Sequence, residues 1–174
     1  WQLCVLRIGP QDLPHSTLLA RLLVLAVLVV GMLNALVGGR DATMFVPRSL
    51  LTLVFLLAVP WALLRWRGFG ARFTQTVTAI AGSSLFYGLA FLPISLMASG
   101  YEPGVAPAPT VVAATWLGLL FTGWKLAING HIWHHALEMP RVLGLVLAFL
   151  LFMIQVGLDW RIMVLLGLVE PAAQ

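Results

Sequence analysis

Four side chains near the end of one apolar stretch have residue types that can bind a metal ion: His131, His134, His135 and Glu138. Counted from His131, the other three lie three, four and seven residues further along the chain, so a helix would place all four on one face. Imidazoles and a carboxylate on one face can bind zinc or another borderline metal, or hydrogen-bond a quinone or a lipid headgroup. We interpret the four residues as the wet end of an overlong helix, with a metal site as the alternative.

Other cofactor and catalytic chemistry has less support in the sequence. A haem held by two histidines needs a second histidine at matching depth, but His15 precedes the first apolar stretch. The zinc-protease motif, the serine nucleophile elbow and the phosphate-binding glycine loop are missing from the sequence. We therefore expect no catalytic residues and no cofactor, with a metal ion, haem or quinone at the histidine cluster as the alternative.

Charged residues are rare and lie close to the ends of the apolar stretches. All the carboxylates are assigned to such ends or to loops: Asp12, Asp41, Glu102, Glu138, Asp159 and Glu170. Arg21 and Lys125 lie within about a turn of the predicted boundary, where a long basic side chain extends to the interface. A transporter or channel is disfavoured, because no buried charge and no inverted repeat is evident.

A stripe of hydroxyl side chains is a second candidate site. Thr76, Ser83 and Tyr87 are seven and four residues apart, which places them on one side of a helix. Such a stripe can line a polar cavity, although hydroxyls in membrane helices more often bond to helix carbonyls or to a neighbouring helix. We favour the second interpretation.

The composition requires a lipid environment around most of the chain. Of its 174 residues 61% are hydrophobic and 9% are charged, and the mean hydropathy is +1.00, whereas soluble chains carry about 25% charged residues. The net charge of +4 arises from basic residues scattered beside apolar runs, which indicates loops of a membrane protein and no nucleic-acid surface. A single cysteine, Cys4, excludes an internal disulfide and a thiolate metal cluster.

The fold class predicted is all-α, a polytopic transmembrane bundle with five spans, each long enough for a hydrocarbon core of about 30 Å. The first span is expected to be a retained anchor, and Pro60 should kink the second. Residues 162–169 either extend the fifth span or lie at the interface. The spans cover residues 17–37, 49–65, 74–98, 110–137 and 142–158, within a membrane domain at 17–169 flanked by a juxtamembrane segment at 1–16 and a tail at 170–174.

The distribution of basic residues predicts a cytoplasmic N-terminus and an external C-terminus. In this orientation seven basic residues lie on the cytoplasmic side: Arg7, Arg21, Arg65, Arg67, Arg72, Lys125 and Arg141. Three lie on the other side: Arg40, Arg48 and Arg161.

Small residues at four-residue spacing predict where the helices approach one another closely. They form four stripes along the predicted spans: Thr78 with Gly82; Ser84 with Gly88; Ala114, Gly118 and Thr122; and Gly144 with Ala148.

The residues from Arg72 to Ser84 and from Trp124 to Arg141 resemble the corresponding regions of the bacterial members of the Yip family. This is a family of small five-span, Rab-interacting membrane proteins with a cytoplasmic N-terminus, and the resemblance covers about residues 10–165. Asp12-Leu13-Pro14 resembles the Asp-Leu stretch of the eukaryotic members, but the Tyr-Gly-Pro that follows it there is absent here. The resemblance implies an adaptor or organiser of membrane proteins.

From these observations we expect a non-catalytic integral membrane protein of a bacterial inner membrane. Its expected partners are membrane lipids and other integral membrane proteins, in a hetero-oligomeric complex in which it acts as adaptor or accessory subunit. The alternative is a redox or metal-binding subunit that uses His131, His134, His135 and Glu138.

Overall fold

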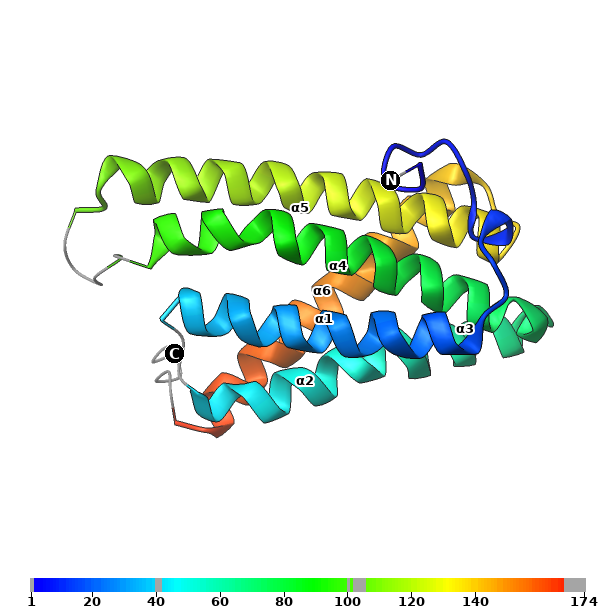
Figure 1. The fold of residues 1–174 in the computed structure, drawn as a ribbon, viewed down its shortest axis with the longest axis horizontal. Helices are drawn as coiled ribbons and strands as arrows, with labels where there is room; N and C mark the ends of the chain where they lie inside the picture. Colours follow the sequence, from blue (N-terminus) through cyan, green and yellow to red (C-terminus); the bar gives the residue numbers. More distant parts are fainter. Residues whose placement is uncertain (1, 40–41, 100, 102–105, 168–174) are drawn as a thin grey trace, which may run out of the picture.

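Long apolar helices form the framework of the chain in a computed structural model, which describes residues 2–39, 42–99, 101 and 106–167 (Figure 1). Over these residues five helical segments are long and apolar enough to cross a membrane. The helices are α1 (Thr17–Val37), α2 (Phe45–Leu53), α3 (Val59–Trp66), α4 (Phe73–Ala98), α5 (Pro109–Ala136) and α6 (Arg141–Leu165), and short 3-10 turns cover Pro10–Asp12, Ala42–Met44 and Gly70–Arg72. The α2 and α3 helices together make one span.

The five predicted spans are confirmed, with two changed boundaries. The second begins at Phe45 and not at residue 49, because Pro47 fits within a first helical turn whose N–H groups have no helical partners. The fifth continues through Asp159 to Leu165, so the first part of the 162–169 segment extends this helix. The predicted tail at 170–174 and the loop residues Arg40 and Asp41 lie outside the described residues.

Pro60 lies next to a change in the hydrogen-bonding pattern of the second span, and the kink expected there stays a prediction. A π-helical turn at Val54–Ala58 joins α2 to α3, and the Val59 N–H donates to the Val54 carbonyl five residues earlier. Proline lacks an N–H and its ring clashes with the carbonyl four residues before it, so a wider turn relieves both problems. The π turn places Phe55 and Leu56 toward the interior of the bundle.

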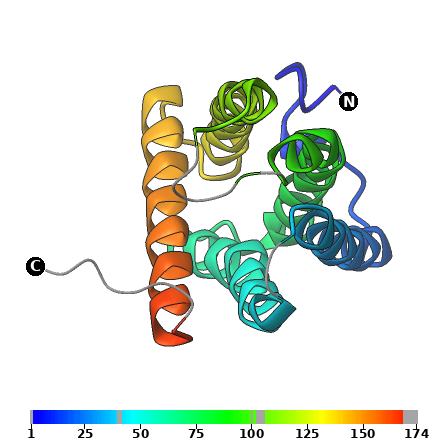
Figure 2. The same cartoon turned by 90° about the vertical axis from the view of Figure 1, so that its left-hand side faces the viewer.

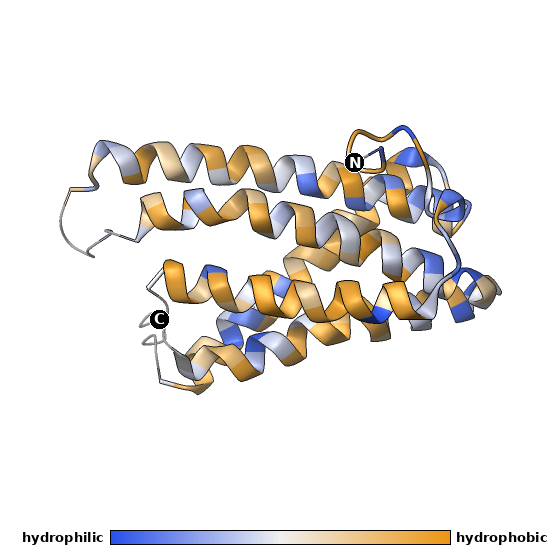
Figure 3. Cartoon of the chain, viewed as in Figure 1, coloured by the Kyte–Doolittle hydropathy of each residue, from blue (hydrophilic) through white to orange (hydrophobic). Residues whose placement is uncertain are grey.

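The described helices surround a central space (Figures 1 and 2). Extensive contacts join α1 to α4, α4 to α5 and α5 to α6, whereas α2 makes sparser contacts with α1 and α6. The α6 helix crosses the other helices obliquely and approaches α2 at its C-terminal end (Figure 2). Hydrophilic residues gather at the end where α1 begins and α3 ends (Figure 3). We call this the basic end, defined by Arg65, Arg67, Arg72 and Arg141.

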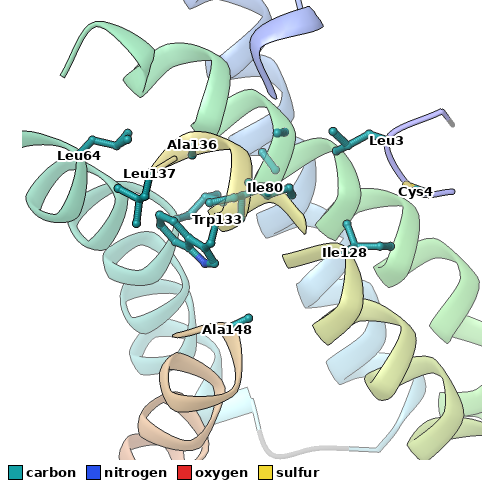
Figure 4. Packing of buried hydrophobic residues seen from close by; sticks show 13 residues of the cluster. Leu3, Cys4, Leu64, Ile80, Ile128, Trp133, Ala136, Leu137 and Ala148 are labelled. Carbon is teal, nitrogen blue, oxygen red and sulfur yellow. The ribbon is translucent and has the colours of Figure 1, made fainter. Parts of the chain in front are cut away.

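The buried apolar core lies near the basic end (Figure 4). Leu64, Ile128 and Ile132 have no exposed surface, and they come from α3 and α5. Leu3 and Cys4 of the segment before α1 belong to the same cluster, so that this segment packs on the bundle. The Trp124 Nε1–H fixes it further by donating to the Cys4 carbonyl at 3.2 Å.

Glycines allow backbone contact where the sequence predicts small-residue stripes. A Cβ at Gly144 would lie 2.5 Å from the carbonyl oxygen of Gly130, so α5 and α6 touch through their backbones. A Cβ at Gly88 would lie 2.8 Å from Val30 of α1. These close approaches hold α6 and α1 against the central pair α4 and α5, as expected for association of helices in lipid.

Replacing Gly144 with alanine should therefore weaken the α5–α6 crossing. The added methyl group meets backbone, which cannot move away cheaply, so we expect a loss of about 1–3 kcal/mol in the free energy of unfolding. The matched control is Gly157→Ala on the same helix, where a Cβ meets nothing within 4 Å. Unfolding in detergent measures both variants; equal stability of the two would contradict the crossing.

Candidate functional site

The structure brings the three predicted histidine ligands together at the C-terminal end of α5. The ring of His135 lies 4.5 Å from that of His131 and 4.5 Å from that of His134, centroid to centroid. One nitrogen of each of two rings is already engaged: His131 Nε2–H donates to the Ile8 carbonyl at 3.0 Å, and His134 Nδ1–H donates to the Met139 carbonyl. The contact with Ile8 fastens the N-terminal segment to α5.

The fourth predicted ligand, Glu138, does not share this face, which corrects the prediction that all four residues converge. The helix ends at Ala136, and Glu138 has a left-handed φ of 50°. The Met139 N–H bonds back to the His134 carbonyl at 3.1 Å, which is the pattern of a Schellman cap. This cap turns Glu138 toward Arg72 of the neighbouring 3-10 turn, with which it forms an ion pair.

Among the described residues no group of three histidine, cysteine, aspartate or glutamate side chains is arranged to hold a metal ion. Metal binding by His131, His134 and His135 stays a prediction. It would use the nitrogens that face away from the carbonyls of Ile8 and Met139.

A different candidate site lies between the five spans. Here a cavity of about 560 Å³ receives side chains from every one of them. Every one of the five spans contributes both apolar and polar side chains to its wall. The polar side chains that line it are Asn34, Arg48, Thr52, Ser84, Tyr87, Thr122, Lys125, Asn129, Gln155 and Asp159.

Lys125 lies on the wall of this cavity and well inside the bundle. Eleven residues separate it from the end of α5 at Ala136, which is about 16 Å of helix at about 1.5 Å per residue. Its Nζ donates to Ser83 Oγ of α4 at 2.8 Å, and Ser83 itself donates to the Ile80 carbonyl. Lys125 therefore bonds inward, and the prediction that it extends to the interface is wrong.

An ion pair joins α2 to α6 at the opposite end of the cavity. Arg48 Nε and Nη2 donate to the two carboxylate oxygens of Asp159 at 2.8 and 2.7 Å, and each side chain is 27% exposed. Asp159 lies six residues before the end of α6, so its assignment to a span end is wrong. The helix continues because Arg48 neutralises the charge, and because glycine and proline are absent between Asp159 and Leu165.

Two further polar contacts connect helices around the cavity. Asn34 of α1 donates to the carbonyls of Val30 and Gly88 at 2.9 Å each and accepts from Ser95 Oγ at 3.0 Å, which satisfies its buried amide. On the hydroxyl stripe, Tyr87 lines the cavity and lies 3.4 Å from Thr122, oxygen to oxygen.

The remaining members of that stripe, Ser83 and Thr76, do not line the cavity. Ser83 bonds to a helix carbonyl, as favoured, and also accepts from Lys125. Thr76 Oγ1 is buried without a hydrogen-bond partner in the described part of the chain.

Comparison with known protein families, with curated proteins and with solved structures finds no match to this chain. The resemblance to the Yip family stays a prediction.

Sequence reasoning missed Asn34 and the inward direction of Lys125 and Asp159. One signal was present: Lys125 and Asn129 are four residues apart, which places a cation and an amide on one face of an otherwise apolar helix. Arg48 and Asp159 were also predicted on the same side of the membrane, although nothing in the sequence pairs residues so far apart.

The Arg48–Asp159 pair should contribute measurably to the closure of α2 against α6. Arg48→Ala and Asp159→Ala are each expected to lower the free energy of unfolding by about 1–2 kcal/mol, because each leaves a charge without a partner. The double variant should lose less than the sum, with a coupling of about 0.5–2 kcal/mol. Arg161→Ala, an exposed arginine on the same helix, is the control. Additive losses in detergent unfolding would show that the pair is not coupled.

Proposed function

We propose that this chain is an integral membrane protein that binds a small acidic amphiphile in the cavity between its helices. The observation that carries the proposal is the position of Lys125, a cation on the cavity wall with no carboxylate partner among the described residues.

A charged group inside a membrane protein is costly unless it is paired, and such groups commonly mark a ligand or ion pathway. The lysine ammonium has three N–H donors. In the described residues one of them is directed to Ser83, and that hydroxyl carries no charge. An acidic group in the cavity would supply both the missing countercharge and the acceptors for the remaining donors.

The size and lining of the cavity fit a ligand with one acidic group and one apolar part. Its volume of about 560 Å³ lies within the range of about 300–1,000 Å³ that is typical of small-molecule sites. Next to Lys125 the wall carries Ser84 and Asn129, whereas Phe55 and Phe152 supply aromatic surface elsewhere. The polar group of a ligand can thus lie against polar side chains while its apolar chain lies against aromatic side chains of the same cavity.

This proposal differs from the adaptor role expected from the sequence, which stays a prediction. The sequence disfavoured a transporter because neither a buried charge nor an inverted repeat was evident, and the position of Lys125 bears on the first of these two reasons. Binding of an acidic amphiphile is a step that a carrier and a ligand-regulated accessory subunit share.

Lys125→Met should weaken this binding while the protein stays folded. We expect dodecanoate and dodecyl phosphate to raise the unfolding temperature of the wild-type protein in a neutral detergent, and dodecanol and dodecylammonium to leave it unchanged. Loss of the charge-assisted contact should weaken the affinity for the two acids by about tenfold or more, equivalent to about 1.4 kcal/mol. Titration of the unfolding temperature gives the affinities.

Two further variants make the test specific. Lys125→Arg should keep most of the affinity, because it keeps the charge. Arg21→Met removes an exposed basic residue of α1 that does not line the cavity, and it should bind like the wild type. If neither acid stabilises the wild-type protein, or if Arg21→Met loses as much affinity as Lys125→Met, the proposed function is wrong.

A further inference from the structure

The walls of the cavity suggest both the class of its ligand and the direction from which the ligand comes. We infer that the acidic amphiphile is a bilayer lipid with an anionic headgroup, which reaches Lys125 sideways through a gap between α1 and α2. This inference rests on the proposed function and adds the source of the ligand to it.

The gap is a second cavity of about 140 Å³, lined by residues of α1 and of the α2 region. It shares Val27, Gly31, Arg48 and Thr52 with the central cavity, so these residues form the common wall of the two spaces. We call this gap the lateral portal. Its other lining residues are mostly apolar: Leu28, Met32, Ala35, Met44, Phe45 and Ser49.

Gly31 is the residue that keeps the lateral portal open. It is exposed, and a Cβ built on it would meet nothing within 4 Å. A glycine in the interior of a helix is less favourable than alanine by about 0.8–1.0 kcal/mol. At Gly88 or Gly144 a close helix contact accounts for the glycine, but at Gly31 no such contact exists in the described structure. The missing side chain leaves room for a ligand.

The helix on the other side of the lateral portal is the one that the bundle holds least firmly. The α2 helix has fewer contacts with its neighbours than α1, α4, α5 and α6 have with theirs. Its contact with α6 includes the Arg48–Asp159 pair, and the π turn follows at Val54–Ala58. A helix that has few tertiary contacts and is followed by a π turn can move aside for an acyl chain more easily than a closely packed helix.

The lateral portal and Lys125 are separated by a distance that a lipid can bridge. Val30 packs on Gly88, and Lys125 bonds to Ser83, so Gly31 lies about five residues of α4 from the level of the lysine. This is about 8 Å along the axis at about 1.5 Å per residue. An anionic headgroup at Lys125 thus leaves its acyl chains directed through an apolar opening into the bilayer, where the hydrophobic part of a lipid is stable.

Filling the lateral portal tests the inference. Gly31→Leu should fold like the wild type, since open space receives the side chain, and it should retain phosphatidylglycerol at least about tenfold less than the wild type. The measurement is native mass spectrometry of the full chain from detergent micelles that contain phosphatidylglycerol, phosphatidylcholine or inorganic phosphate. The wild type should retain phosphatidylglycerol in preference to phosphatidylcholine, and inorganic phosphate should not bind.

Gly123→Leu and Gly157→Leu are matched controls, because both glycines are exposed, have nothing within 4 Å of a Cβ and lie outside both cavities. They should bind phosphatidylglycerol like the wild type.

Unchanged lipid binding by Gly31→Leu, with folding verified by its unfolding temperature, overturns the inference. So does equal retention of inorganic phosphate by the wild type and Gly31→Leu, which would identify a soluble anion as the ligand of this site, whereas the proposed function is decided separately by the titrations with dodecanoate and dodecyl phosphate. Gly31→Ala, with a smaller side chain, should have an intermediate effect, and a full loss of binding with this variant would also contradict a steric role.

Discussion

Polar groups that enter the hydrocarbon of a bilayer must find their partners within the protein, and this constraint organises the whole bundle. Asn34 satisfies it completely, with its amide bonded to α1 and α4. Arg48 and Asp159 satisfy it as a pair across α2 and α6. Among the charged side chains on the cavity wall, Lys125 satisfies it least, because its described partner is an uncharged hydroxyl. The charge of Lys125 thus lacks a countercharge at the place where the cavity lies. Functional sites are where a fold is expected to depart from the rules that hold in the rest of its structure.

The cavity exists because the helices differ in how closely they can approach. At Gly144 and Gly88 the backbone of one helix meets its neighbour, and this packing fixes α1, α4, α5 and α6 as a firm wall. The oblique path of α6 carries Asp159 away from α5 and toward α2 (Figure 2). The second span then closes the remaining side, although its π turn and sparse contacts leave space beside it. Tight crossings at some glycines thus make an opening elsewhere unavoidable.

Most of the fold could be predicted from the sequence, because the length of an apolar run and its proline and glycine boundaries are local properties. The small-residue stripes are equally local, and they located the crossings at Gly88 and Gly144. The candidate site could not be predicted in the same way. The depth of Lys125 depends on how far α5 projects beyond its neighbours, and the partner of Asp159 lies 111 residues away. The predicted convergence of Glu138 failed because a helix cap, and not helical periodicity, sets its direction.

A cation kept without a counter-ion implies a balance between stability and binding. Replacing Lys125 with an apolar residue of similar size should make the empty bundle more stable, since replacement of a buried charge by a well-packed apolar side chain is often neutral or stabilising. A position that lowers the stability of the unliganded protein but has a role with a ligand is typical of binding sites. The same reasoning applies to Gly31, whose flexibility costs helix stability and whose missing side chain has no packing purpose in the described structure. Gly123 and Gly157 also lack a close neighbour, but Gly31 differs from them because it lines the cavity. Lys125 and Gly31 therefore both depart from the most stable sequence on the same cavity, and a ligand there accounts for both.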